Sequence, residues 1–199
     1  MKPNPKSLFA PFTEYSFRIT LVCLAFAVFT VTLSCKKKPA SQVDRTKSAS
    51  GQVILADINE GTGLRQIEWK DGITDAIEIG GKKCRRVTRT GLDEVYVYFV
   101  VDPGLKQTNW LDCTLTVEYF DGCEGGFYVE YDGHDPQAKK NGAYTRSEKR
   151  IRQTRSLAWQ REKFVLKGAR FENSQNGGAD FRLRVQSPEF YVRSVTLAF

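Results

Sequence analysis

The chain has 199 residues, of which 41% are hydrophobic, and it carries 30 Lys and Arg against 23 Asp and Glu. This length favours one ordinary domain, and the hydrophobic content excludes both a disordered chain and a polytopic membrane protein. Five Cys are too few for a disulfide-stapled miniprotein, and the single His, His134, excludes most zinc sites and Ser/His/Asp triads. A net charge of +7 indicates nucleic-acid binding only where the basic residues cluster.

The first 35 residues predict an export signal. Residues 19–33 carry no charge and are preceded by three basic residues, Lys2, Lys6 and Arg18. Such a basic segment and short apolar run are typical of a secretory signal, whereas a membrane-spanning helix needs about 20 apolar residues. The run ends in TLSC at residues 32–35, which resembles the lipobox of bacterial lipoproteins. The resemblance implies that residues 1–35 are a lipoprotein signal peptide, with a signal helix, and that Cys35 becomes the lipidated N-terminus.

Two other interpretations of this segment stay open. In an uncleaved single-pass anchor, residues 36–38, KKK, would be the stop-transfer cluster and would keep the domain in the cytoplasm; plain secretion is the second. The lipoprotein interpretation places the chain at the bacterial cell envelope. It favours the outer membrane over the inner, because Lys36 does not resemble an inner-membrane retention signal. Residues 36–51, KKKPASQVDRTKSASG, then predict a flexible basic linker between the lipid and a domain at 52–199.

The remaining residues predict an all-β domain. Short apolar or alternating runs recur about every ten residues between Gly, Asn, Asp and Pro. We expect strands at residues 53–56, 73–79, 84–90, 95–101, 113–120, 127–131, 161–167, 179–185 and 191–199, with 113–120 and 127–131 forming a hairpin. Together they predict an antiparallel β-sandwich of jelly-roll type. Residues 132–144 form the longest irregular stretch, which we expect to be a surface loop of the kind that often carries function.

Several segments of the domain resemble a known class of module. The most specific is QNGGADFR at residues 175–182, and the others are GGKKCRR at 80–86, VEYFD at 117–121, FYVEYD at 127–132, FVL at 164–166, ARFEN at 169–173 and YVRSV at 191–195. Over roughly residues 57–199 they resemble the galactose-binding-like and carbohydrate-binding jelly rolls attached to bacterial polysaccharide-degrading enzymes and envelope proteins. The resemblance implies a non-catalytic module. Such jelly rolls often carry structural calcium, to which Asp57 and Glu60 could contribute, but no calcium-loop spacing supports it, so we predict no cofactor and no metal.

Sugar binding requires aromatic faces for stacking and polar side chains for the hydroxyls. The candidate platforms lie beside polar residues or end the long loop: Trp69, Trp110, Trp159 and Tyr144. Alternatively, each Trp covers an end of the sandwich. Asn176 and Asp180 could bind a ligand by hydrogen bonds. Alternatively, Asn176 begins a tight Asn-Gly-Gly turn that needs positive φ, and Asp180 pairs with an Arg.

Other charged and sulfur-containing residues permit further hypotheses. If the hairpin forms, Glu118 and Glu130 share a face, as the carboxylate pair of a glycosidase would; otherwise they pair with Arg182 and Arg184. The basic residues of 139–155 could bind an acidic polysaccharide or lipid head groups, or could protect an edge strand.

Three Cys remain in the domain, Cys84, Cys113 and Cys123, so at most one internal disulfide can form. A disulfide that includes Cys84 is more plausible than one between Cys113 and Cys123.

The sequence therefore favours a non-catalytic, lipid-anchored envelope protein with a carbohydrate-binding-like β-sandwich. Its expected partners are the membrane, through the lipid, and a polysaccharide, with acidic polymers among the candidates; nucleic acid is disfavoured by export. Two alternatives remain. One is an envelope protein that binds another protein or is structural, and the other is a hydrolase or lyase acting on glycans.

Overall fold

The computed structural model describes residues 49–91, 94–106 and 111–199, which form twelve β-strands and two short 3-10 helices. The predicted signal peptide, the lipidation site Cys35 and the platform candidate Trp110 lie outside these residues, as does most of the predicted linker. The first strand begins at Ser50, two residues before the predicted start of the domain. In the described part of the chain, no helix is both long and apolar enough to cross a membrane.

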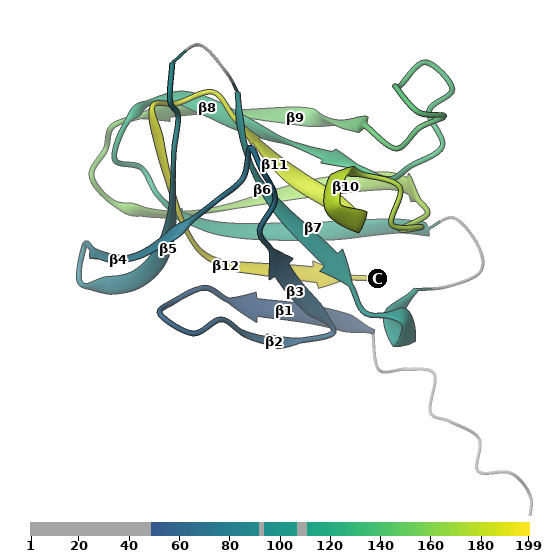
Figure 1. Ribbon diagram of the computed structural model, residues 1–199, viewed down its shortest axis with the longest axis horizontal. Helices are drawn as coiled ribbons and strands as arrows, with labels where there is room; N and C mark the ends of the chain where they lie inside the picture. Colours follow the sequence, from purple (N-terminus) through teal and green to yellow (C-terminus); the bar gives the residue numbers. More distant parts are fainter. Residues whose placement is uncertain (1–48, 92–93, 107–110) are drawn as a thin grey trace, which may run out of the picture. The chain divides into compact units, whose positions relative to one another are not determined.

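Two antiparallel sheets make up the domain (Figure 1). The first contains, in spatial order, β10 (Trp159–Ala169), β7 (Leu111–Phe120), β12 (Glu189–Ala198), β1 (Ser50–Ile54) and β2 (Glu60–Thr62); β5 (Lys82–Thr88) also pairs with β12, and β4 (Asp75–Ile79) pairs with β5. The second contains β3 (Leu64–Ile67), β6 (Val95–Val101), β11 (Phe181–Val185), β8 (Glu124–Tyr131) and β9 (Thr145–Thr154). The short helices are η1 (Pro103–Leu105) and η2 (Asn176–Gly178). The predicted antiparallel β-sandwich is confirmed.

The inward faces of the two sheets form one hydrophobic core. Strand β11 shows the alternation that builds it, since Phe181, Leu183 and Val185 are fully buried in the core while Arg182 and Arg184 are on the opposite face. Aromatic rings join the two layers: the Phe127 ring of β8 lies 4.6 Å from that of Phe190 of β12, centroid to centroid. The core therefore fixes which side chains each strand presents to solvent.

The first and last strands of the domain are paired. Strand β1 lies beside β12 in an antiparallel register that runs from Ser50 opposite Ala198 to Ile54 opposite Ser194. Strand β12 pairs on its other side with β7 and so lies inside the sheet. The N-terminal strand is thus held by the strand that ends the chain.

The predicted hairpin of 113–120 and 127–131 is wrong, because β7 and β8 belong to different sheets. The chain crosses from one layer to the other at Asp121, whose carboxylate accepts hydrogen bonds from the backbone N–H groups of Thr154, Arg155 and Ser156. This contact holds the crossing against the turn between β9 and β10. The regular alternation of both strands was compatible with a hairpin, but β7 pairs with β10 and β12 whereas β8 pairs with β11 and β9.

All three Cys of the described residues are free, so the single disulfide that the sequence permitted, with Cys84 as its more plausible member, is not formed. Cys113 is in the main core, whereas Cys84 and Cys123 belong to a smaller cluster around Phe120 and Tyr191. Burial raises the pKa of the Cys84 thiol to about 11 and that of Cys113 to about 12. Both thiols are therefore protonated at neutral pH and are packing groups.

Candidate ligand-binding cleft

The outer face of the second sheet carries two rows of polar and aromatic side chains. The first row crosses the strands in register and consists of Tyr98, Arg182, Glu130 and Arg146. The second row is offset by two residues on β6, β11 and β8 and by four on β9, where the register shifts, and it consists of Tyr96, Arg184, Tyr128 and Arg150. Because side chains on one face of a sheet repeat every second residue, strand alternation brings the six residues of β6, β11 and β8 together, and the register shift of β9 places Arg146 and Arg150 beside them.

Glu130 is the central anion of this face. Its side chain is 2% exposed and contacts three guanidinium groups, those of Arg182, Arg184 and Arg146. Arg182 donates to Glu130 Oε2 from both Nε and Nη2, at 2.8 and 2.6 Å, and Arg184 donates to Oε1 at 2.8 Å. Arg146 is more distant, with Nε 3.5 Å from Oε1, and its side chain is 61% exposed. A nearly buried carboxylate with this many donors is held in a fixed position.

Arg182 is enclosed on both planar faces. Its guanidinium carbon lies 3.7 Å from the ring centroid of Tyr96 and 4.4 Å from that of Tyr144. Its Nη1 donates to the Tyr98 hydroxyl, which in turn donates to Asp71 at 2.7 Å. Stacking and hydrogen bonding together make Arg182 a fixed part of the cleft floor.

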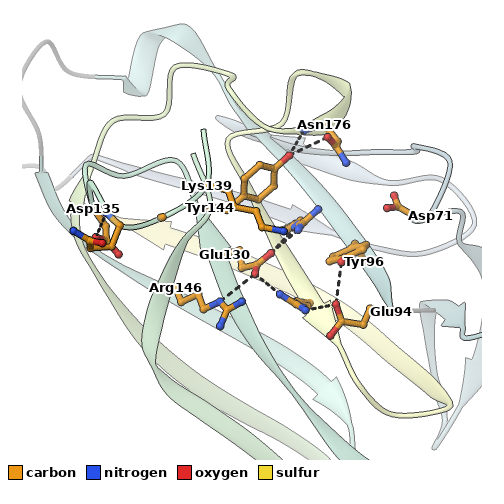
Figure 2. A pocket seen from close by; sticks show the side chains of 13 residues that line it. Asp71, Glu94, Tyr96, Glu130, Asp135, Lys139, Tyr144, Arg146 and Asn176 are labelled. Atoms are coloured by element: carbon orange, nitrogen blue, oxygen red, sulfur yellow. Dashed lines mark hydrogen bonds and ion pairs between the residues drawn. The ribbon is translucent and has the colours of Figure 1, made fainter. Parts of the chain in front are cut away.

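Loops flank the outer face of the second sheet, and together they enclose an open hollow of about 690 Å³ (Figure 2). The lining residues are Asp71, Glu94, Tyr96, Glu130, Asp135, Gln137, Ala138, Lys139, Tyr144, Arg146, Asn176, Arg182 and Arg184. Tyr144 and Asn176 are joined by a hydrogen bond of 2.9 Å from the Tyr hydroxyl to Asn176 Oδ1. Asp71 and Asp135 lie at opposite ends of the hollow, as Figure 2 shows. We call this hollow the cleft.

Buried polar side chains fix the loop that carries Asn176. Asp132 is fully buried and accepts hydrogen bonds from the Glu172 N–H and the Arg170 guanidinium. Gln175 donates through Nε2 to the carbonyl oxygens of Glu130 and Ala143. The loop is therefore attached to β8 and to the end of the 132–144 loop, which brings Asn176 beside Tyr144.

The charges that line the cleft are balanced. Four cationic side chains, Lys139, Arg146, Arg182 and Arg184, face four carboxylates, Asp71, Glu94, Glu130 and Asp135, so the formal charges cancel. Burial acts to raise the pKa of Glu94, but the hydrogen bond and charge of Arg184 outweigh it and hold that pKa below its ordinary value. The cleft thus offers many donors and acceptors without a net charge.

The predicted site residues are only partly brought together. Tyr144 and Asn176 line the cleft, and the predicted tight turn at Asn176 is confirmed by the positive φ of Gly177 and Gly178. Trp69, 37% exposed, lies beside the cleft wall: a Cβ added at Gly177 would be 3.0 Å from its ring. Trp159 belongs to the other sheet, where its Nε1 donates to the Gly80 carbonyl.

Asp180 does not contact the cleft and is structural. Its carboxylate is fully buried, pairs with Lys106 rather than with an Arg, and accepts hydrogen bonds from the N–H groups of Val101 and Asn173. The expected role of Asp180 as a ligand contact therefore does not agree with its position.

The expected carboxylate pair is also separated. Glu118 is on β7 in the first sheet, where it binds Lys82 and Ser194, and Glu130 is on β8 in the second. The expectation that the two share a face is thus wrong, whereas the alternative pairing of Glu130 with Arg182 and Arg184 is confirmed. Strand β9 is an edge strand, so its basic residues agree with the expectation of a protected edge.

Replacing Glu118 should reduce stability in a pH-dependent way. Burial acts to raise the pKa of Glu118, but hydrogen bonds from Lys82 and Ser194 outweigh it and lower that pKa from its ordinary value of 4.5. The stabilisation is therefore complete above pH 4.5 and is lost as the pH falls through the lower, folded-state pKa. We expect Glu118→Gln to reduce the free energy of unfolding by about 1–2 kcal/mol at pH 7 and by much less at pH 3, in urea titrations.

The exposed Glu78 of β4 provides the control, since Glu78→Gln should change little at either pH. An equal loss for Glu118→Gln at pH 7 and pH 3 would contradict the assignment of its stabilising role to the ionised carboxylate.

The sequence did not indicate that Tyr96, Glu94 and Arg184 would form a cleft with Tyr144. The signal that could have shown it is the pair of Arg on β11, placed opposite aromatic and acidic residues of β6 and β8. Among the described residues, no group of three or more His, Cys, Asp and Glu is arranged to hold a metal ion.

No protein-family model matches the chain, and no curated protein matches its sequence. Solved structures similar to it include a family 29 carbohydrate-binding module from Piromyces equi, with 12% identity, a TM-score of 0.44 and coverage of 77% of this chain and 92% of that one. A family 11 module from Clostridium thermocellum, in complex with a β-1,3-1,4-mixed-linked tetrasaccharide, has 15% identity, a TM-score of 0.35 and coverage of 75% and 96%. A family 28 module specific for non-crystalline cellulose has 12% identity, a TM-score of 0.33 and coverage of 68% and 84%. These structural neighbours are carbohydrate-binding modules, the class of module that the sequence resembles.

Proposed function

We propose that this chain is a non-catalytic, lipid-anchored protein of the bacterial cell envelope that binds a neutral glycan in the cleft. The observation that carries the proposal is the rigid, charge-balanced floor around Glu130 and Arg182, bounded by the rings of Tyr96 and Tyr144. Its volume of about 690 Å³ is within the range of sites for small ligands. The mixed-linked tetrasaccharide named for the family 11 module and the cellulose named for the family 28 module are also neutral glycans.

The chemistry of the lining favours hydroxyl groups. A hydroxyl both donates and accepts, so it can bind carboxylates such as Asp71 and Asp135 and donors such as Lys139 and Asn176. A polyanion would gain little, because Arg182 and Arg184 are already paired with Glu130. Acidic polymers are therefore expected to bind more weakly than neutral ones.

The same contacts disfavour hydrolysis within the cleft. A glycosidase requires a carboxyl group with a raised pKa as general acid, together with a second carboxylate. Arg184 holds the pKa of Glu94 below its ordinary value, and Glu130 is bound by three Arg. Both carboxylates therefore act as fixed hydrogen-bond acceptors in the proposed site.

Binding can be tested by affinity electrophoresis of the detergent-solubilised full chain through gels that contain neutral glucans, mannans, xylans or galactans, or the acidic polymers alginate and polygalacturonate. We expect retardation by at least one neutral polymer and a loss of affinity of about tenfold or more for Tyr144→Ala, since a tenfold change corresponds to about 1.4 kcal/mol. Tyr144→Phe, which keeps the ring, should retain more affinity than Tyr144→Ala.

A matched pair of Lys variants provides the control. Lys139→Ala removes a cation that lines the cleft and should weaken binding. Lys163→Ala removes an exposed cation from β10 of the other sheet and should leave binding unchanged. Failure of every polymer to retard the chain would overturn the proposed function. Retardation by acidic polymers alone would contradict a neutral-glycan site in the cleft and would indicate binding at the exposed cations of β9 instead.

The anchor requires its own measurement. In bacteria fed an alkyne-labelled fatty acid, the full chain should become labelled and Cys35→Ala should not. Labelling of Cys35→Ala, or membrane release of the wild type by high salt, would contradict a lipid attached at Cys35.

A further inference from the structure

A second, smaller hollow adjoins the cleft at its Asp135 end. It has a volume of about 240 Å³ and is lined by Tyr131, His134, Asp135, Thr145, Arg146, Glu148, Val165 and Lys167. Asp135 and Arg146 line both hollows. The two hollows are thus neighbours with a shared boundary, and we call the smaller one the side hollow.

The order of the strands gives the cleft a direction. Its floor runs from Tyr96 on β6, across Arg182 on β11 and Glu130 on β8, to Arg146 on β9. With neighbouring strands about 4.8 Å apart, the four strands span about 14 Å. From Arg182 to Arg146 the path follows the register and is perpendicular to the strands, whereas Tyr96 is offset from this row by two residues. Strand β9 is the edge of the sheet, so a ligand that follows the path beyond Arg146 leaves the sheet face.

The side hollow lies where such a ligand would pass over the edge. One part of its wall comes from β9 and another from Val165 and Lys167 of β10, the edge strand of the first sheet. Val165 is 55% exposed, so it presents an apolar surface to a bound sugar ring. Lys167 is already paired with Glu148 at 2.8 Å, so this hollow, like the cleft, has its charges matched.

We propose that the ligand is an extended neutral polysaccharide bound along its length, which crosses the second sheet in the cleft and continues past Arg146 into the side hollow. This inference rests on the proposed function and adds the ligand's length and path. Arg146 is central to it, because it lines both hollows while contacting Glu130 only at 3.5 Å. Among the described residues, its other guanidinium nitrogens have no hydrogen-bond partner within the protein, and they are available to hydroxyl groups at the boundary.

The test uses the neutral polymer that retards the full chain most, partially hydrolysed with acid and separated into oligosaccharides of two to ten units. Isothermal titration of the full chain should show affinity that increases with length until both hollows are occupied. Val165→Arg places a long side chain in the side hollow, and it should weaken the longest oligosaccharides about tenfold while leaving the shortest ones that bind unchanged. Ile54→Arg, at an exposed site on β1, introduces the same Arg side chain three strands away from β10 in the first sheet and should have no effect.

The outcomes separate this inference from the proposed function. If Tyr144→Ala abolishes binding but Val165→Arg affects no length, or all lengths equally, the path into the side hollow is wrong and the cleft stands. If no oligosaccharide or polymer binds, both proposals fail. If Val165→Arg has the same thermal unfolding temperature as the wild type, its loss of affinity does not come from misfolding.

Discussion

Glu130→Gln should be the most destabilising conservative substitution on the outer face of the second sheet. The change keeps the shape of the side chain but removes the negative charge that Arg182 and Arg184 share. The Arg182 side chain is only 9% exposed, so its charge would remain buried without an anionic partner. Breaking a buried pair in this way costs about 3–5 kcal/mol, and we expect a loss of that size in the free energy of unfolding measured with urea.

Glu124→Gln is the matched control for this substitution. Glu124 is an exposed residue of the same strand, and its replacement should change stability by less than about 0.5 kcal/mol. The double variant Glu130→Gln, Arg182→Met should be more stable than the sum of its single variants predicts, because it removes both members of the pair. A loss below about 1 kcal/mol for Glu130→Gln would show that water screens these charges far more than their burial indicates.

Asp180→Ala should have an effect of similar size from a different part of the fold. The substitution leaves the N–H groups of Val101 and Asn173 without their acceptor. It also removes the carboxylate paired with Lys106, whose ammonium group keeps only the side-chain oxygen of Asn173. Each unsatisfied buried group costs about 1–3 kcal/mol, so we expect a total of about 3–5 kcal/mol in urea unfolding after partial access of water. Asp180→Asn retains one acceptor oxygen and should lose less than Asp180→Ala.

The same variant should also weaken glycan binding. Asn173 has a φ of +59°, a conformation in which the Asp180 carboxylate holds both its N–H and its side-chain amide. Release of Asn173 would loosen the loop that places Asn176 in the cleft. Asp112→Asn, at an exposed position of β7 that accepts one hydrogen bond from Gly168, is the comparison and should leave binding intact. Normal affinity in Asp180→Ala would show that Asn176 is held without this support.

The fold was predictable from the sequence because strand alternation is a local property. In residues 179–185, the period of two already placed Phe181 and Leu183 on one face and Arg182 and Arg184 on the other, as the structure has them. The pairing of strands is not local, so β7 and β8 were expected to form a hairpin although they lie in different layers.

The candidate site was predictable only at its loops. Tyr144 stood out because it ends the long loop, and Asn176 because it is a polar residue of the segment 175–182; both line the cleft. The floor could not be found in the same way, because Tyr96, Glu130 and Arg182 come from three strands whose order in the sheet no single segment encodes. Trp159 was misleading for the opposite reason: its polar sequence neighbours gave no sign that its ring packs on Phe120 in the first sheet.

The pairing of β1 with β12 would have a mechanical consequence if the chain is tethered through Cys35 as proposed. A pull on the chain ahead of Ser50 acts first on β1 in one sheet, whereas a polymer held in the cleft pulls on the other. One route for this force runs through the five residue pairs of β1 and β12 and across the core, and another follows the chain from β1 through β2 to β3 of the second sheet. Pulling along β1 loads its ladder hydrogen bonds together, in shear, so under the proposed function the pairing of the five-residue β1 with β12 contributes to the load that the domain resists.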